Sequence, residues 1–355
     1  MFTRSLPLFA FLVLNSAAGI YARAAPLTAV HRGADAYRIW RAAAIHALIQ
    51  RGNQNSLATA AILRAEPIDG KATPKTTASA ATADPTALSL ASRASDMAPD
   101  DTAIGWIRLR VCALTPLCDI RGAATELRWL DPDNAAAWLP TLAAAQKEQD
   151  AMEIDRVLRH MAEGTRVDFY WNHVVVLMFD ALRAVSKSLP GSFADSDATR
   201  LAFVERIAGA EILVHFSTLV DACRDSKTGT ERRASCVTVA RILRNSDTIS
   251  AQLIGIALER RFAPADGKDA RALAERRRVL EWRRRSAAQF DRPLLPWLRS
   301  AHARWRLAHM RTLRRQEDVN VAILRERGVP LDPPPPPPPP PQPPPPPEPL
   351  HMQLP

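Results

Sequence analysis

Glycine-rich loops and the short signatures of common enzymes are absent from this sequence. It has 13 glycines among 355 residues, and none of them builds the loop that cradles a nucleotide phosphate. Neither a GxSxG elbow nor an HExxH helix occurs, and these are the marks of serine hydrolases and zinc proteases. Ser192, in LPGSF, is interpreted as a turn residue. The sequence therefore nominates no catalytic residue, no cofactor site and no metal site.

Long apolar runs are missing beyond the N-terminal region. Residues 1–24 combine one early positive charge, an apolar stretch over residues 6–14 and the small-residue pattern Ala22-Arg23-Ala24. This pattern predicts a secretory signal peptide cut after Ala24, since the apolar stretch is too short to cross a bilayer. We expect an exported protein, periplasmic or secreted, with no transmembrane segment in the mature chain.

The four cysteines fit an oxidising compartment. Cys112 lies six residues before Cys118, and Cys223 lies thirteen residues before Cys236. Four cysteines allow three pairings, of which pairing each cysteine with its nearest neighbour is the simplest. Zinc binding is the alternative, although neither pair has the CxxC spacing of a zinc site.

Helical spacing of apolar residues predicts an all-α fold, because strand-like alternation is almost absent. We expect helices over residues 100–113, 119–130, 135–149, 151–163, 168–188, 197–221, 231–245 and 248–262. The predicted regions are a signal peptide (1–24), a helix hairpin (25–65), an Ala/Thr/Pro-rich linker or loop (66–86), a helical domain (87–267), an arginine-rich helical segment (268–327) and a disordered proline tail (328–355).

The string LDPDNAAAW, residues 130–138, resembles the junction between two tetratricopeptide repeats. In that family a proline ends one helix and a bulky residue six positions later packs in the next, as Pro132 and Trp138 are spaced here. Asp133 or Asn134 can cap the following helix. The resemblance covers residues 100–163 and implies an irregular stack of helix hairpins that offers a surface to another protein.

The arginine-rich segment carries most of the net charge of +10. Residues 271–327 hold 16 arginines and six acids, and two long basic helices are expected there. Two triplets, Arg276, Arg277, Arg278 and Arg283, Arg284, Arg285, repeat seven residues apart on the same sides of a helix. They are candidates for binding anionic lipid or lipopolysaccharide, with a solvated helix face as the alternative and nucleic acid unfavoured.

Aromatic, histidine and acidic side chains add candidates of lower weight. Trp282, Trp297 and Trp305 are interpreted as core-facing rather than stacking residues. His302 and His309 are two helical turns apart, too distant to share a metal directly, and are interpreted as interface or surface residues; His173 is interpreted as a core histidine. The acids Glu148, Asp150, Glu153 and Asp155 are expected to solvate a helix turn.

The prolines of the C-terminal tail predict an extended polyproline II segment. Fifteen prolines occur within residues 333–349, and such a segment serves either as a ligand for an aromatic groove or as a spacer. Taken with the absent motifs, the sequence favours a non-enzymatic exported scaffold for an unknown protein partner. The alternatives are a binder of anionic envelope surfaces and an enzyme whose site carries no local motif.

Overall fold

The computed structural model describes residues 27–66, 85–190, 196–209, 212–224, 229–264, 267–290 and 296–335. Within these ranges it has fifteen α-helices, two 3-10 helices and one isolated bridge between Asn134 and Arg166, and no strand. The predicted all-α fold is confirmed. The predicted signal peptide, Ser192, most of the predicted linker and the proline tail beyond residue 335 lie outside the described residues.

The helices follow one another at short intervals. In chain order they are α2 (Leu27–Arg51), α3 (Gln54–Ala65), α4 (Pro85–Met97), α5 (Thr102–Ala113), α6 (Ile120–Leu130), η1 (Ala135–Trp138), α7 (Leu139–Lys147), α8 (Ala151–Glu163), α9 (Trp171–Val185), η2 (Ser186–Ser188), α10 (Asp197–Gly209), α11 (Ile212–Ala222), α12 (Thr230–Leu243), α13 (Ile249–Phe262), α14 (Lys268–Ala288), α15 (Pro296–Met310) and α16 (Gln316–Glu326).

The helices differ from the predictions in four places. Helix α4 was not predicted, although Ala87, Leu90, Ala91 and Ala94 are buried at helical spacing; small alanines give a weak apolar signal. The helix expected over residues 197–221 is two helices, α10 and α11, and the one expected over 135–149 begins as the 3-10 turn η1. The arginine-rich segment holds three helices rather than two, because α16 follows α14 and α15.

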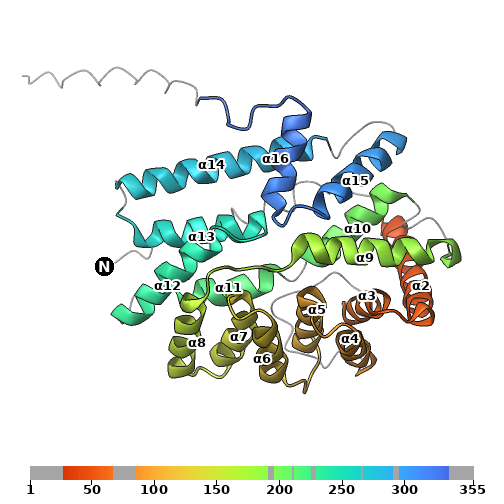
Figure 1. The fold of residues 1–355 in the computed structure, drawn as a ribbon, viewed down its shortest axis with the longest axis horizontal. Coiled ribbons are helices and arrows are strands. Elements are labelled where there is room, and N and C mark those ends of the chain that lie inside the picture. The colour runs from red at the N-terminus through yellow and green to blue at the C-terminus, as the bar shows by residue number, and fades with distance from the viewer. Residues whose placement is uncertain are drawn as a thin grey trace, which may run out of the picture.

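The helices form two parts, which meet at α9 and through the pairs α7 with α11 and α8 with α12 (Figure 1). Helices α3 to α8 stand side by side in one row, and sequential neighbours such as α3 and α4, α5 and α6, and α7 and α8 pack together. Helix α9 runs across this row and contacts α2, α3, α5, α10 and α15. On the other side lie α12 to α16, with α16 packed across α14 (Figure 1).

The core is densest around α3 and α9. In α3 every residue from Ser56 to Leu63 is buried, because this helix packs against α2, α4, α5 and α9. Helix α9 buries ten of its fifteen residues, including Val175, Met178 and Phe179. A helix that is apolar on all sides is an interior helix, so α3 and α9 form the centre on which the surface helices pack.

The repeat-like junction begins and ends where its residues require. Helix α6 ends at Leu130, and the chain turns at the next residues, Asp131 and Pro132. The side chain of Asn134 caps η1 by accepting from the Ala136 N–H at 3.1 Å. Trp138 stacks on His160 of α8, with ring centroids 4.7 Å apart, and lies beneath the Arg128 guanidinium. The junction thereby joins α6, η1 and α8 into one unit.

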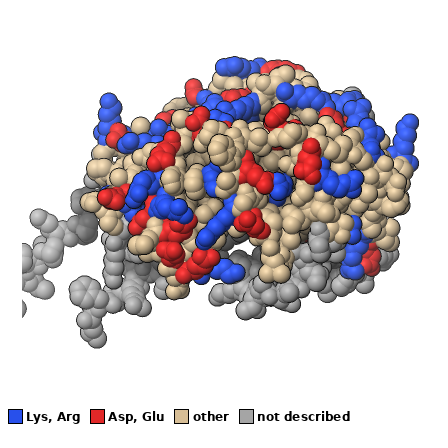
Figure 2. Space-filling view, turned by 60° about the horizontal axis from the view of Figure 1, so that its bottom comes forward, with Lys and Arg blue, Asp and Glu red and all other residues tan. Residues whose placement is uncertain are grey.

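Charges of both signs are interspersed over the face that the row of helices presents (Figure 2). Many are close ion pairs, such as Arg121 with Glu148 at 3.2 Å and Arg108 with Glu126. This face therefore has no broad field of one sign.

Candidate functional site

A polar cleft of about 730 Å³ opens where three distant segments of the chain meet. The turn after α6 supplies Asp131, the chain entering α9 supplies Arg166, Asp168, Tyr170, Asn172 and His173, and the connection between α15 and α16 supplies residues 310–314. The connecting residues come together because α9 packs against both α5 and α15. The cleft thus lies between the row of helices and the arginine-rich part.

The floor of the cleft is a closed hydrogen-bond network around Tyr170. Its hydroxyl donates to Asp131, whose other carboxylate oxygen pairs with Arg166. The Asn134 amide donates to the Tyr170 hydroxyl oxygen at 3.0 Å and to the Asp168 backbone carbonyl at 2.9 Å. Burial raises the pKa of Tyr170, and the hydrogen bond to Asp131 raises it further. Tyr170 is therefore a neutral donor at any physiological pH.

The backbone at Tyr170 is held in the left-handed region, with φ 52° and ψ 33°. Non-glycine residues adopt this conformation at a cost, and such strain is concentrated at ligand and switch sites. The Tyr170 N–H donates to the Asp168 carboxylate at 2.8 Å, which holds the turn in place. This turn orients the Tyr170 side chain toward Asp131 and immediately precedes the first residue of α9.

Two buried carboxyl groups, Asp168 and Asp247, meet behind this turn. Asp247 accepts hydrogen bonds from the Phe169 and Trp171 backbone N–H groups at 3.0 and 2.9 Å, and Asp168 accepts from Arg314 at 2.6 Å. Burial raises the pKa of Asp247 well above its usual range, and the charge and hydrogen bond of Asp168 act in the same direction. Asp247 therefore favours its protonated form more than a free carboxyl group does, while Asp168 bonds Arg314.

Asn172 leaves an unused acceptor beside the cleft. The side chain is 2% exposed; its amide donates to the Leu313 carbonyl at 2.7 Å, while its Oδ1 atom has no hydrogen-bond partner. The same holds for Arg166 Nε and Trp171 Nε1 nearby, so several buried polar atoms around this turn lack a partner.

The rim carries exposed polar groups. Arg311 pairs with Asp180 at 2.7 Å and Arg314 reaches down to Asp168. His173 lies 3.9 Å from the Asp101 carboxylate, and its side chain is 56% exposed. The interpretation of His173 as a core histidine is therefore wrong: the core-facing positions of this turn of α9 are Trp171, Asn172 and Val174, so His173 points outward.

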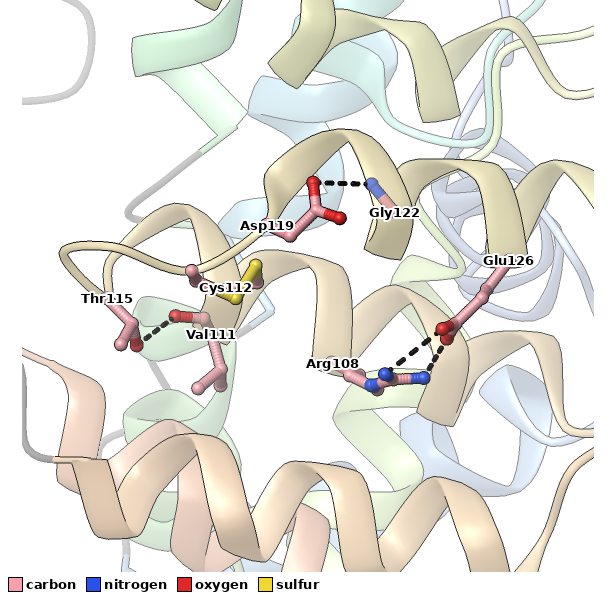
Figure 3. Close-up of a disulfide and its surroundings, with 8 residues drawn as sticks. Arg108, Val111, Cys112, Thr115, Asp119, Gly122 and Glu126 are labelled. Atoms are coloured by element: carbon pink, nitrogen blue, oxygen red, sulfur yellow. Dashed lines mark hydrogen bonds and ion pairs between the residues drawn. A yellow bond between two sulfur atoms is a disulfide. The ribbon is translucent and has the colours of Figure 1, made fainter.

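The cysteines pair as nearest neighbours, as the sequence predicts. Disulfides join Cys112 to Cys118 and Cys223 to Cys236. The first closes the turn between α5 and α6, next to the Asp119 side chain that caps α6 through the Gly122 N–H at 2.9 Å (Figure 3). No group of three or more metal-ligating side chains is found among the described residues.

Most of the six candidate arginines have partners within the chain. Arg276 and Arg283, seven residues apart, both bind the carboxylate of Glu317 on α16, at 2.6 and 2.8 Å. Arg276 also donates to Gln252 of α13. Within α14, Arg277 pairs with Glu281, Arg278 with Glu275, and Arg285 with the Glu281 carbonyl, while Arg278 also reaches the Pro334 carbonyl after α16. The Nε atom of Arg284 is buried without a hydrogen-bond partner. The two triplets thus do not form one open cationic surface.

The histidines and tryptophans of the same region mostly contact one another. Trp305 stacks on His302 and meets His309 edge-on, with ring centroids 5.8 and 4.2 Å apart. His302 is buried rather than at the surface. Trp282 donates its indole N–H to the Pro330 carbonyl, and the side chain of Trp297 lies outside the described residues. None of these groups reaches the cleft.

The four acids grouped near α8 behave as surface residues. Asp150 caps α8 by accepting from the Glu153 N–H, and Glu153 pairs with Arg156 on the same helix. Asp155 pairs with Arg232 of α12, and Glu148 with Arg121. Each carboxylate serves a cap or an ion pair.

The residues that define the cleft were missed at the level of sequence. One signal was present: Asp168 and Asn172 interrupt the largely apolar stretch VDFYWNHVVV at residues 167–176. Buried polar residues are the informative exceptions in such runs.

No described helix is long and apolar enough to cross a membrane. Comparison with protein-family models, with curated proteins and with solved structures finds no match.

Proposed function

We propose that this chain is an exported, non-enzymatic helical scaffold that binds a segment of another protein in the cleft beside α9. The observation that carries the proposal is the convergence of polar side chains from three distant segments on one opening. The volume of about 730 Å³ lies within the range of known ligand sites. Export rests on the N-terminal pattern, and the two disulfides accord with it.

A polypeptide is the ligand class that suits these groups. Its backbone carries N–H donors and carbonyl acceptors together, and its carbonyls match the guanidinium groups of Arg311 and Arg314 in the cleft lining. The repeat-like unit of α6, η1 and α8 borders the same opening through Asp131. A groove formed between stacked hairpins is the surface that helical-repeat proteins use for binding.

The ionisable groups of the cleft support binding rather than catalysis. A general acid or base must reach a proton of the substrate. Here Tyr170 is bonded to Asp131, Asp168 is bonded to Arg314, and Asp247 is enclosed behind the turn. These groups hold the cleft in shape, and the ionisable groups left at the rim are His173, beside Asp101, and the arginines.

Photo-crosslinking in the producing cell tests the proposal directly. Thr312, at the rim, and Thr125, on the outer face of α6, are both exposed and both bond a carbonyl of the preceding helical turn. Each is replaced in turn by a photo-reactive phenylalanine, and adducts are sought in envelope extracts. We expect a discrete protein adduct from position 312 and none from position 125.

A competing substitution sharpens the result. Thr312→Trp, which fills the rim, should abolish an adduct formed from a reactive residue placed at His173, whereas Thr125→Trp should leave it unchanged. Equal adducts at positions 312 and 125, or none at either while the protein is present in the envelope, would rule out a partner in the cleft.

A further inference from the structure

The segment that leads into the prolines is held by one face of α14. Trp282 donates its indole N–H to the Pro330 carbonyl at 3.0 Å, and Arg283 donates Nε–H to the Leu331 carbonyl at 3.1 Å. One turn earlier on the helix, Arg278 donates to the Pro334 carbonyl at 2.9 Å. Three donors of one helix therefore hold three carbonyls of a segment that bends at Leu331 and Asp332 and runs in the opposite direction.

The chemistry of these contacts selects for proline-rich chain. Proline has no backbone N–H, so a proline segment presents carbonyl groups without donors of its own. Donor side chains, with an aromatic indole among them, are what grooves that recognise such segments use. The site on α14 offers donors only, and Pro330 and Pro334 supply two of its three acceptors.

Two further contacts fix the register of the segment. Arg283 lies 3.7 Å from the Asp332 carboxylate, and Val329 and Leu331 pack against the main core. Because Arg283 also binds Glu317, the same side chain ties α14, α16 and the segment together. The contacts thus hold the chain immediately before the run of nine prolines at residues 333–341.

We propose that Arg278, Trp282 and Arg283 form a recognition site for a proline-rich segment, and that its occupant is residues 330–334 of the same molecule. The basic helix serves as the anchor of the proline tail, so part of the arginine-rich surface is occupied by the chain itself. A segment tethered next to its site binds at a high effective concentration, so each donor can contribute modestly and the anchor still holds.

Radical footprinting of the full-length chain, read by mass spectrometry at Leu331, tests the anchor. Arg278→Ala with Trp282→Phe removes two donors but keeps the aromatic ring and the Arg283–Glu317 pair. We expect labelling of Leu331 to rise several-fold. The matched control is Arg285→Ala with Trp129→Phe, since Arg285 bonds only within α14 and Trp129 is an exposed tryptophan on α6; it should leave the labelling unchanged.

A competition arm uses the unaltered protein, so that it does not depend on how a variant folds. A ten-proline peptide added in excess should raise Leu331 labelling, and a Gly/Ser peptide of equal length should not. If neither the double substitution nor the proline peptide changes the labelling of Leu331, the proposal is overturned. Labelling that falls as protein concentration rises would show that the tail of a second copy is the occupant, and would overturn the intramolecular assignment.

Discussion

Helices α3 to α8 and helices α14 to α16 are held together by different forces. In α3 eight successive residues are buried and apolar contacts surround the helix. In α14 five of 21 residues are buried, and Leu273 and Leu280 form a small cluster with Ile256. Between α14 and α16, apolar packing of Val319, Ile323 and Leu324 in the core is joined by the buried carboxylate of Glu317, which binds Arg276 and Arg283. A high count of arginines in a segment is therefore a poor measure of its free charge.

The largest effect is expected from a cavity in the apolar part. Leu63 of α3 and Leu280 of α14 are both fully buried. Leu63→Ala should lower the free energy of unfolding by about 3–4 kcal/mol, the upper range for a rigid core, and Leu280→Ala by about 2 kcal/mol, because the smaller cluster can collapse around the cavity. Denaturant unfolding measures both. A larger loss of unfolding free energy at position 280 than at position 63 would show that the core around α3 is not the more rigid one.

The next effect concerns the ion pairs. The Glu317 side chain is 3% exposed, and Glu317→Gln keeps its shape but leaves two guanidinium groups without their counter-ion. We expect the free energy of unfolding to fall by about 2–3 kcal/mol, since breaking a buried ion pair leaves an uncompensated charge inside the protein. The matched substitution in the row of helices is Glu126→Gln. The Glu126 side chain is 53% exposed, so this substitution should lower the free energy of unfolding by less than about 0.5 kcal/mol. Similar losses of unfolding free energy at positions 317 and 126 would show that the buried and the exposed ion pairs contribute equally to stability.

The carboxyl pair between the two parts predicts a dependence on pH. Because the pKa of Asp247 is raised in the folded state, the folded chain holds a proton that the unfolded chain has released above about pH 4. The contribution of Asp247 to stability is therefore full below the unfolded pKa and is lost as pH rises through the folded pKa, with a slope of at most about 1.4 kcal/mol per pH unit.

Asp168→Asn tests this dependence while it keeps the oxygen that accepts from the Tyr170 N–H. Removing the neighbouring charge should lower the pKa of Asp247 and reduce the loss of stability on raising the pH. Urea unfolding at several pH values between 4 and 8 gives the slope for each protein. A slope unaltered by the substitution would show that the two carboxyl groups do not interact.

The smallest effect is expected from arginines without a partner on another helix. Arg277 pairs with Glu281 one turn away on α14. Arg277→Ala combined with Arg284→Ala should leave the free energy of unfolding within about 0.5 kcal/mol of the original, and should leave binding to anionic vesicles unchanged at both low and high salt. A salt-sensitive loss of vesicle binding would instead support the anionic-surface alternative.

Local chemistry made part of this structure predictable. The all-α fold, the nearest-neighbour disulfides and the cap at Asn134 follow from spacing and residue type within a few positions. The seven-residue repeat placed Arg276 and Arg283 on one side of α14, but their common partner Glu317 lies 41 and 34 residues away. No local periodicity reports such a contact.

The cleft was beyond prediction for the same reason. Asp131, Asp168 and Arg314 come from segments that only the packed α9 brings together, and the left-handed turn at Tyr170 has no glycine to announce it. Helix α4 shows a second limit, since a helix that buries alanines has almost no apolar contrast between its faces. Sequence reasoning thus gave the elements and missed the contacts between distant ones.

Hydrogen exchange along α14 and α3 is the most direct test of the central claim that the arginine-rich segment is a fixed part of the folded body. We predict that the amides of α14 around Leu280 exchange as slowly as those of α9, and that Glu317→Gln speeds exchange in α14 and α16 while α3 stays protected. Rapid exchange throughout α14 in the unaltered protein, insensitive to Glu317→Gln, would contradict the account.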